Sequence, residues 1–407
     1  MSILRSGCDG TERDASVAFD EVLAKARLFL FAAIGGALTG LVSYAFLKGL
    51  DWATNSRLRH GWIIWFLPVA GFAVGAAYHY LGGRAKGGTP AVIEQTHTYT
   101  HGVPTRMAPL IFGGSVVGHL FGASVGREGA ALQLAGSVTD TAARAGRLSP
   151  DDRRLLVVAS LAGGWGAVFA VPVTGIVFAM QVTRTHRWRA LVPSVIAAFT
   201  GKWVVDQLGY RFSVRPQLPR THWTIGLPLK LVLAGVVMGV AARVFVWSLK
   251  ALKVRMAHRM RYQPLRTAVG GAITIALVPV FGRDYLGLST PLMQQAFAGH
   301  HVDIWEPILK MLFTVIALGS GFVGGEVLPL FIMGAAFGSA IAPGLHAPGP
   351  LLATTGSCAA FASAASVAIT GIVLAVEQFG WYALVPAVIV GLTARIVAGR
   401  PGLYVAH

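Results

Sequence analysis

The sequence predicts an all-α integral membrane protein built from many tilted and broken helices. Apolar residues make up 54% of the 407 residues, whereas Asp, Glu, Lys and Arg together make up only 13%. A soluble protein carries about 25% charged residues. The 50 glycines show no collagen-type period and suit closely packed membrane helices. A soluble enzyme is therefore not expected.

Long apolar segments follow one another along nearly the whole chain. Several exceed the ~20 residues that one crossing needs, so each of these holds two segments, and we expect about eleven or more embedded helices. Gly and Pro interrupt many of them, and a bilayer tolerates this only where the freed backbone lines a cavity or is covered by protein. Broken helices at this depth are typical of transporters. The segments are roughly Leu28–Leu50, Trp62–Leu81, Met107–Val125, Leu155–Val182, Leu191–Val205, Ile225–Leu252, Ala268–Phe281, Ile308–Ile341 and Leu351–Ala398.

The charge balance gives the orientation. Lys and Arg outnumber Asp and Glu by 34 to 17, and the basic residues gather at Arg144–Arg154, Arg184–Arg189 and Lys250–Arg266. The positive-inside rule places these connections in the cytoplasm, and we favour it over lipid-specific or nucleic-acid binding. We expect multiple crossings of the inner (plasma) membrane and no nucleic-acid partner.

The N-terminal residues 1–26 are polar and lack the apolar core of a cleavable signal. We expect them to form a cytoplasmic segment, with an interfacial helix over Val17–Leu28. The end of the chain at His407 leaves no room for a soluble regulatory domain. Cys8 and Cys358 are too few and too far apart for a disulfide framework.

Two parts of the sequence resemble each other at a nearly constant spacing. The segment from Gly126 to Gly136 aligns with Gly324–Gly334 at an offset of 198 residues, with glycine, glutamate and glycine in register. Thr174–Ala179 aligns with Thr370–Ala375 at an offset of 196 residues. The agreement predicts a duplicated half of about 200 residues. Such duplications commonly form inverted repeats with the substrate site between them.

Glu128 and Glu326 occupy equivalent places in this repeat, each within apolar, glycine-rich sequence. An ionisable group at membrane depth is costly and is usually functional. Because burial penalises the charged form, such a carboxyl group can hold and release a proton. A structural role remains open for either glutamate, as a helix cap or as the partner of a buried arginine. For Arg127 we expect mainly an ion pair or a backbone contact.

The glycines beside these glutamates suit an anion site. They let the backbone turn sharply and direct N–H groups at a small anion, at the positive end of the helix that follows. In each half a Gly-x-Glu sequence opens an apolar helix, at Gly129 and at Val327. The duplication predicts an anion site formed by two such turns.

The segment Ser124–Gly129, followed by Gln133 and Gly136, resembles the GREG signature of the CLC family of chloride channels and anion/proton antiporters. Gly324–Pro329 stands at the family's second pore motif, and Leu403–Tyr404 resembles the segment with the pore tyrosine. The resemblance covers about residues 24–404. It implies a homodimer with one anion pathway per subunit, and two inverted half-repeats at residues 27–215 and 216–407.

Variants within the motifs are similar to the fluoride/proton antiporter branch, CLC-F. The chain has Gly87-Gly88-Thr89-Pro90 and Gly325-Glu326-Val327-Leu328-Pro329, where chloride-selective members have serine and phenylalanine turns. Arg106–Leu110 and His119–Gly122 also resemble that branch. Val182 stands where chloride/proton exchangers carry an internal proton glutamate, which the fluoride branch also lacks.

The resemblance implies export of cytoplasmic fluoride in exchange for protons. Glu128 would be the gating glutamate and Glu326 a second protonatable group. Leu328 replaces a threonine expected in the fluoride branch, so a chloride/proton antiporter and a passive chloride channel stay open. The implied anion-binding residues are Gly88, Thr89, Gly126, Arg127, Gly129, Gly325, Val327, Leu328 and Tyr404.

Other polar residues have simpler interpretations. His119 lies in an embedded stretch and is expected to be a hydrogen-bonded core histidine, with a role in the pore as the alternative. His97 and His101 flank a predicted loop, and we expect neither a metal site nor a cofactor. Gln181 and Glu377 match across the repeat and should serve helix packing or an interface. The sequence has no motif of a zinc, serine or phosphate-loop enzyme.

Overall fold

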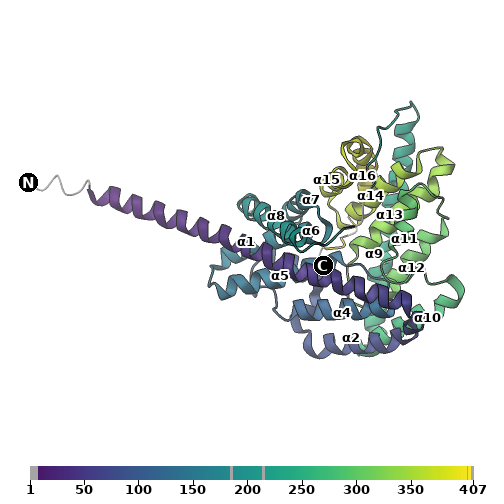
Figure 1. Cartoon of the computed structure of the whole chain (residues 1–407), viewed down its shortest axis with the longest axis horizontal. Coiled ribbons are helices and arrows are strands. Elements are labelled where there is room, and N and C mark those ends of the chain that lie inside the picture. The colour runs from purple at the N-terminus through teal and green to yellow at the C-terminus, as the bar shows by residue number, and fades with distance from the viewer. Residues whose placement is uncertain (1–7, 184–186, 213–215, 401, 405–407) are drawn as a thin grey trace, which may run out of the picture.

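The structure is a computed structural model that describes residues 8–183, 187–212, 216–400 and 402–404 (Figure 1). Within these ranges the chain forms sixteen α-helices and four 3₁₀ helices, and the β-pairing is a single isolated bridge. Six of the helical segments are long and apolar enough to span a membrane. The prediction of an all-α membrane protein is confirmed.

The helices up to residue 207 include the first long membrane helix and the first glycine-rich turn. A 3₁₀ helix or a short loop separates most neighbours, because Gly and Pro interrupt the apolar segments as expected. Their bounds are α1 Cys8–Arg59, η1 Gly61–Phe66, α2 Leu67–Leu81, η2 Gly83–Gly87, α3 Gly88–His97, α4 Met107–Phe121, α5 Glu128–Ala145, α6 Pro150–Phe169, α7 Pro172–Val182, η3 Arg187–Ala190 and α8 Leu191–Gln207.

The helices after residue 226 include the second glycine-rich turn. The apolar segment Leu351–Ala398 was expected to hold two helices because it is longer than one crossing. It contains parts of three α-helices, α14, α15 and α16. Their bounds are α9 Leu227–Arg259, α10 Gln263–Phe281, α11 Thr290–Phe297, α12 Trp305–Ser320, α13 Val327–Leu345, α14 Gly349–Ala365, α15 Ala368–Phe379, η4 Trp381–Ala383 and α16 Leu384–Ala398.

The N-terminal segment differs from the expectation. The interfacial helix expected over Val17–Leu28 is the first part of α1, one continuous helix of 52 residues. No Gly or Pro interrupts the sequence there, and Glu21 and Lys25 form an i, i+4 ion pair at 3.5 Å. Figure 1 shows this part of α1 extending away from the other helices. Residues 1–7 and residues 184–186 of the basic stretch lie outside the described residues.

Glycines allow the helices of the interior to approach closely, as between α13 and α14. A Cβ atom on Gly334 would lie 2.3 Å from the carbonyl oxygen of Gly356, and one on Gly338 would lie 2.2 Å from that of Leu352. Real atoms do not approach so closely, so only glycine fits at these crossings. The two backbones pack together through van der Waals contact, which is how membrane helices associate.

The helices α4 and α12 end in the same way. Gly122 follows α4 with φ of 96°, and Gly321 follows α12 with φ of 112°. Glycine adopts this left-handed conformation without steric cost and ends the helix. A short turn then leads into α5 after Gly122 and into α13 after Gly321. These two terminations position the candidate site.

The helices α7 and α15 cap each other. The Oε1 atom of Gln181 accepts hydrogen bonds from the Thr370 backbone N–H at 2.7 Å and from its hydroxyl at 2.6 Å. Glu377 accepts from the Thr174 N–H at 2.7 Å and from its hydroxyl at 2.6 Å. Each side chain thus satisfies the free N–H groups at the other helix's start. The helix-packing interpretation of Gln181 and Glu377 is confirmed.

Candidate functional site

The two glycine-rich turns meet at an antiparallel β-bridge. The Gly126 N–H donates to the Gly325 carbonyl, and the Gly325 N–H donates to the Gly126 carbonyl, both at 2.7 Å. A Cβ on Gly126 would lie 2.6 Å from Cδ of Pro329, and a Cβ on Gly325 would lie 2.4 Å from the Gly129 nitrogen. Glycine is therefore required at both positions. The bridge brings the N-termini of α5 and α13 together.

The carboxylate of Glu128 lies at the N-terminus of α13. Its Oε2 accepts hydrogen bonds from the backbone N–H of Leu328 at 3.1 Å and of Arg127 at 3.2 Å. Its Oε1 lies 3.3 Å from Nε of Arg127, as an ion pair. The side chain is 2% exposed. Exposed N–H groups and the helix dipole favour a negative charge at this place, so the carboxylate stands where a small anion would bind.

Glu326 directly precedes α13 and approaches the first turn from the other side. A Cβ on Gly129 would lie 3.1 Å from its Oε2. That oxygen is buried and has no hydrogen-bond partner within the described residues. A buried acceptor without a partner is costly unless it is protonated or receives a donor. The two glutamates thus lie beside the same bridge, and the Glu128 carboxylate accepts hydrogen bonds from the backbone on both sides of it, at Arg127 and at Leu328.

A wide cavity, here called the inner cavity, reaches the bridge from the side of the predicted cytoplasmic loops. Its volume is about 480 Å³. Basic side chains line it, and so do Gly324 and Glu326 of the second turn. Positive charge around a cleft raises the local anion concentration. The basic residues and the two implied anion-binding residues that line it are Lys86, Lys250, Lys253, Arg266, Gly88 and Thr89.

A small cavity, here called the outer cavity, lies beside the first turns of α13. Its volume is about 70 Å³, and Arg127, Leu328, Phe169 and Phe331 are among its lining residues. Leu328 is two residues from Glu326, which lines the inner cavity. The Glu128 carboxylate, bonded to the Leu328 N–H, is thus attached to a residue that lines the outer cavity.

Thr89 lies beside the first turn but uses its hydroxyl there. The hydroxyl donates to the Gly129 carbonyl at 3.1 Å and accepts from Nε2 of Gln133 at 3.3 Å. Gly88 begins α3 with φ of 60°, a conformation suited to glycine. The hydroxyl hydrogen is therefore engaged by the backbone in this conformation.

Tyr404 is buried close to the same centre. Its hydroxyl has no hydrogen-bond partner within the described residues. The carboxyl groups of Glu326 and Glu128 are close enough to act on this hydroxyl electrostatically. Its ring packs edge-on against Phe178, with centroids 6.1 Å apart. The structure thus brings the predicted tyrosine and the two glutamates together, although their sequence positions are far apart.

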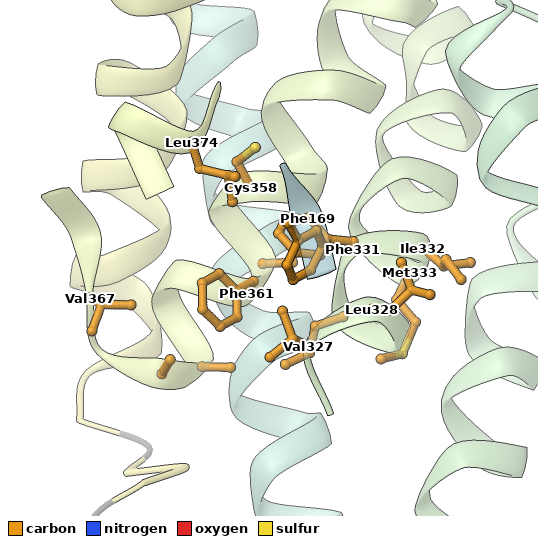
Figure 2. Packing of buried hydrophobic residues seen from close by; sticks show 14 of the residues in the cluster. Phe169, Val327, Leu328, Phe331, Ile332, Met333, Cys358, Phe361, Val367 and Leu374 are labelled. Carbon is orange, nitrogen blue, oxygen red and sulfur yellow. The ribbon is translucent and has the colours of Figure 1, made fainter. Parts of the chain in front are cut away.

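Sequence reasoning missed an aromatic cluster next to the second turn. Phe331 packs against Phe169 at 5.8 Å with an interplanar angle of 69°, and against Phe361 at 5.5 Å (Figure 2). Ring edges carry partial positive charge and can face an anion. Phenylalanine in an apolar helix ordinarily indicates core, so its residue type alone does not indicate a site. The one available signal is the spacing of Phe331, three residues after Leu328, which places both on one face of α13.

Lys310 is a second residue that sequence reasoning missed. Its ammonium group is buried in α12 and reaches the hydroxyls of Ser124 at 2.9 Å and Ser289 at 3.0 Å. It also reaches the carbonyls of Gly287 at 2.8 Å and Tyr285 at 3.3 Å. A single lysine within an apolar segment was the available signal. Lys310 ties the turn before Gly126 to the loop before α11.

The histidines have structural surroundings. The ring of His119 is fully buried and its Nδ1 lies 2.7 Å from the Ser115 carbonyl, as expected for a core histidine. His97 ends α3, and its Nε2 lies 2.8 Å from the carbonyl of Val182. Within the described residues, no group of three or more His, Cys, Asp or Glu side chains is arranged to hold a metal ion.

The sequence and the fold were compared with known proteins. The profile of the family described as voltage gated chloride channel matches residues 70–399. A chloride/fluoride channel protein of Pseudomonas syringae pv. tomato is 39% identical over 396 residues, covering 93% of this chain and 86% of that protein. An H(+)/Cl(-) exchange transporter ClcA of Klebsiella pneumoniae is 26% identical over 92% of this chain and 87% of that protein.

Solved structures agree with this similarity. The crystal structure of a CLC-type fluoride/proton antiporter superimposes with a TM-score of 0.89 at 30% identity, covering 93% of this chain and 97% of that chain. A slow cyanobacterial Cl-/H+ antiporter superimposes with a TM-score of 0.80 at 17% identity, covering 93% and 96%. The second likeness concerns the fold alone.

Proposed function

The chain belongs to the voltage gated chloride channel family, the CLC proteins, and we propose that it exports cytoplasmic fluoride in exchange for protons. The family's description and the superimposed fluoride/proton antiporter support a multi-pass transport protein, which is what we propose rather than an enzyme. The observation that carries the proposal is the hydrogen bond from the Leu328 N–H to the Glu128 carboxylate at 3.1 Å. We further propose that the protein works as a homodimer in the inner (plasma) membrane.

Exchange follows from competition for one place. While Glu128 is ionised, its carboxylate takes the backbone donor at the start of α13, at a residue that lines the outer cavity. A proton removes the negative charge and with it most of the attraction to the N–H groups and to Arg127. The neutral side chain then leaves, and an anion takes the same donor. The ionised carboxylate and the anion are thus alternative acceptors of this donor, and the anion enters only when Glu128 carries a proton.

Glu326 is the proposed second proton carrier. It lines the inner cavity and its Oε2 accepts no hydrogen bond from the described residues. A carboxyl group in that position can take up a proton to satisfy its oxygen. The basic residues of the inner cavity attract the anion from the cytoplasmic side. The proton gradient then drives the anion outward.

Fluoride is the proposed anion because of the surroundings of the outer cavity. A small, strongly hydrated ion needs several closely spaced donors to replace its water. The Leu328 N–H supplies one, and the polarised edges of Phe169 and Phe331 line the same cavity. The similarity to a chloride/fluoride channel protein and to a fluoride/proton antiporter supports this choice.

The experiment uses purified protein in liposomes, with matched fluoride and chloride gradients followed by ion-selective electrodes and a pH electrode. Fluoride efflux that moves protons in the opposite direction, with little chloride movement, is the expected result. Anion efflux without any proton movement would instead identify a passive channel.

Chloride/proton exchange is the second candidate, and the side chains around the site favour it in one respect. Leu328 presents an apolar side chain beside the donor N–H, and the Thr89 hydroxyl donates to the Gly129 carbonyl. Neither side chain offers a hydroxyl hydrogen to a dehydrated ion. Chloride tolerates this better because it is larger and binds water less strongly. Comparable chloride and fluoride fluxes in the same liposomes, coupled to proton movement, would favour chloride/proton exchange.

A further inference from the structure

A large groove separates the C-terminal parts of α9 and α16. The two helices pack in parallel through two glycines, since a Cβ on Gly235 would lie 2.8 Å from the Val390 carbonyl and one on Gly239 would lie 2.6 Å from that of Ala394. The helix α16 ends at Ala398, whereas α9 continues to Arg259. At a rise of 1.5 Å per residue, the part of α9 from Gly239 to Arg259 is about 30 Å long. The groove opens where α9 continues alone, and its volume is about 1190 Å³.

Basic side chains surround this groove. No Asp or Glu occurs in the sequence from residue 207 to residue 283, or from residue 378 to the end. Accordingly, no carboxylate lines the groove among the described residues. The basic residues that line the groove are Arg243, Lys250, Arg255, His258, Arg259 and Arg400.

The same groove has an apolar wall. Trp247 and Val254 line it and are each 70% exposed, and Leu252 and Val246 lie beside them. Tryptophan is typical of the boundary between the headgroups and the hydrocarbon of a bilayer. A ligand that fits this surface therefore carries a negative group at one end and apolar chains at the other.

We propose that this groove binds one anionic glycerophospholipid of the cytoplasmic leaflet. The phosphate lies among Arg255, Arg259 and Arg400, and an acyl chain runs along Trp247 and Val254. The positive-inside rule explains the presence of basic residues at this end of the helices, but it requires neither a groove nor an apolar wall within it. Basic pockets between membrane helices on this side are suited to acidic headgroups.

The position of the groove links lipid binding to anion uptake. Val246 and Lys250 line both this groove and the inner cavity. A lipid phosphate held here places negative charge beside the opening through which the anion approaches Glu326. It therefore weakens the attraction of the inner cavity for anions. Anionic lipid slows the uptake of cytoplasmic anion, and its loss from the groove speeds uptake.

The test measures lipid binding directly on the full-length protein in detergent, by native mass spectrometry during titration with phosphatidylglycerol or phosphatidylcholine. The test variant combines Arg255→Gln, Arg259→Gln and Arg400→Gln. Its matched control removes the same charge from exposed arginines that do not line the groove, in the connections before α9 and after α10. These control substitutions are Arg211→Gln, Arg220→Gln and Arg283→Gln.

The expected result is selective binding of phosphatidylglycerol by the wild type and the control, with about 100-fold weaker binding by the test variant. Each basic side chain near an acidic lipid contributes about 5-fold, so three contribute about 100-fold. Equal binding of phosphatidylcholine, or equal loss in the control, would overturn the proposal. Displacement by glycerol 3-phosphate at the same concentration as lipid would show a small-anion site instead. Because no transport is measured, the outcome is independent of the proposed exchange activity.

Discussion

Replacing Glu128 by glutamine tests the proposed exchange at its centre. The substitution keeps the size of the side chain but removes its charge and its ability to carry the proton. In the wild type the carboxylate accepts bonds from the N–H groups of Leu328 and Arg127 at 3.1 and 3.2 Å, and it pairs with the Arg127 guanidinium. These are the contacts whose strength depends on the charge.

The size of the effect follows from these three contacts. A hydrogen bond to a charged group contributes about 1.5–3 kcal/mol, whereas a neutral bond contributes about 0.5–1.5 kcal/mol. Three contacts that each lose about 1 kcal/mol weaken the hold on the side chain by about 3 kcal/mol. This difference corresponds to about 100-fold lower occupancy of the place at the start of α13. An anion then meets little competition there.

The assay is fluoride efflux from liposomes with simultaneous measurement of pH. In Glu128→Gln we expect proton movement to fall to the level of protein-free liposomes, while fluoride efflux continues and no longer depends on the pH gradient. Glu377→Gln is the matched control, because Gln181 makes the equivalent contacts at α15 with an amide oxygen. The control should retain coupled exchange. Coupled proton movement by Glu128→Gln at the wild-type ratio would refute the competition mechanism.

Three further predictions concern selectivity and stability. Leu328→Thr places a hydroxyl beside the outer cavity and should raise the fluoride-to-chloride flux ratio by about 10-fold, the effect of one good hydrogen bond; an unchanged ratio in the liposome assay would contradict this role of residue 328. Lys310→Met leaves four buried acceptors without their donor and should lower the unfolding free energy by about 3 kcal/mol, seen as a lower melting temperature in detergent. Lys202→Met, at a partly exposed i, i+4 pair, is its control and should cost about 0.5 kcal/mol or less. Gly338→Leu should separate α13 from α14 and reduce the yield of folded protein in size-exclusion chromatography, whereas Gly344→Ala on the same helix, with open space around its Cβ, should not.

The sequence by itself determined the class of the protein and the two residues at its centre. Apolar length and low charge predict membrane helices because a helix satisfies its own backbone in the bilayer, whatever its neighbours are. Glu128 and Glu326 stood out because a carboxyl group is rare in such surroundings, and the repeat placed them in equivalent turns. The division into halves at residue 216 and the homodimer stay predictions.

Local sequence could not predict how the turns meet. The Glu128 carboxylate bonds to an N–H group 200 residues away, and the bridge joins Gly126 to Gly325 over a similar separation. Thr89 stays a predicted anion-binding residue, and the tertiary structure adds that its hydroxyl donates to the Gly129 carbonyl. The helix expected over Val17–Leu28 continues without interruption into the first membrane segment, because that stretch contains no Gly or Pro.

Only the tertiary structure assigned roles to residues whose type is ambiguous. Phe331 reads as ordinary core in an apolar helix, and its place beside the outer cavity depends on how α13 packs against Phe169 and Phe361. Lys310 stabilises the contact between two loops, because these loops bring four hydrogen-bond acceptors to its ammonium group. Helix formation in a membrane depends on local composition, whereas hydrogen-bond donors, cavities and charged grooves arise where distant segments meet.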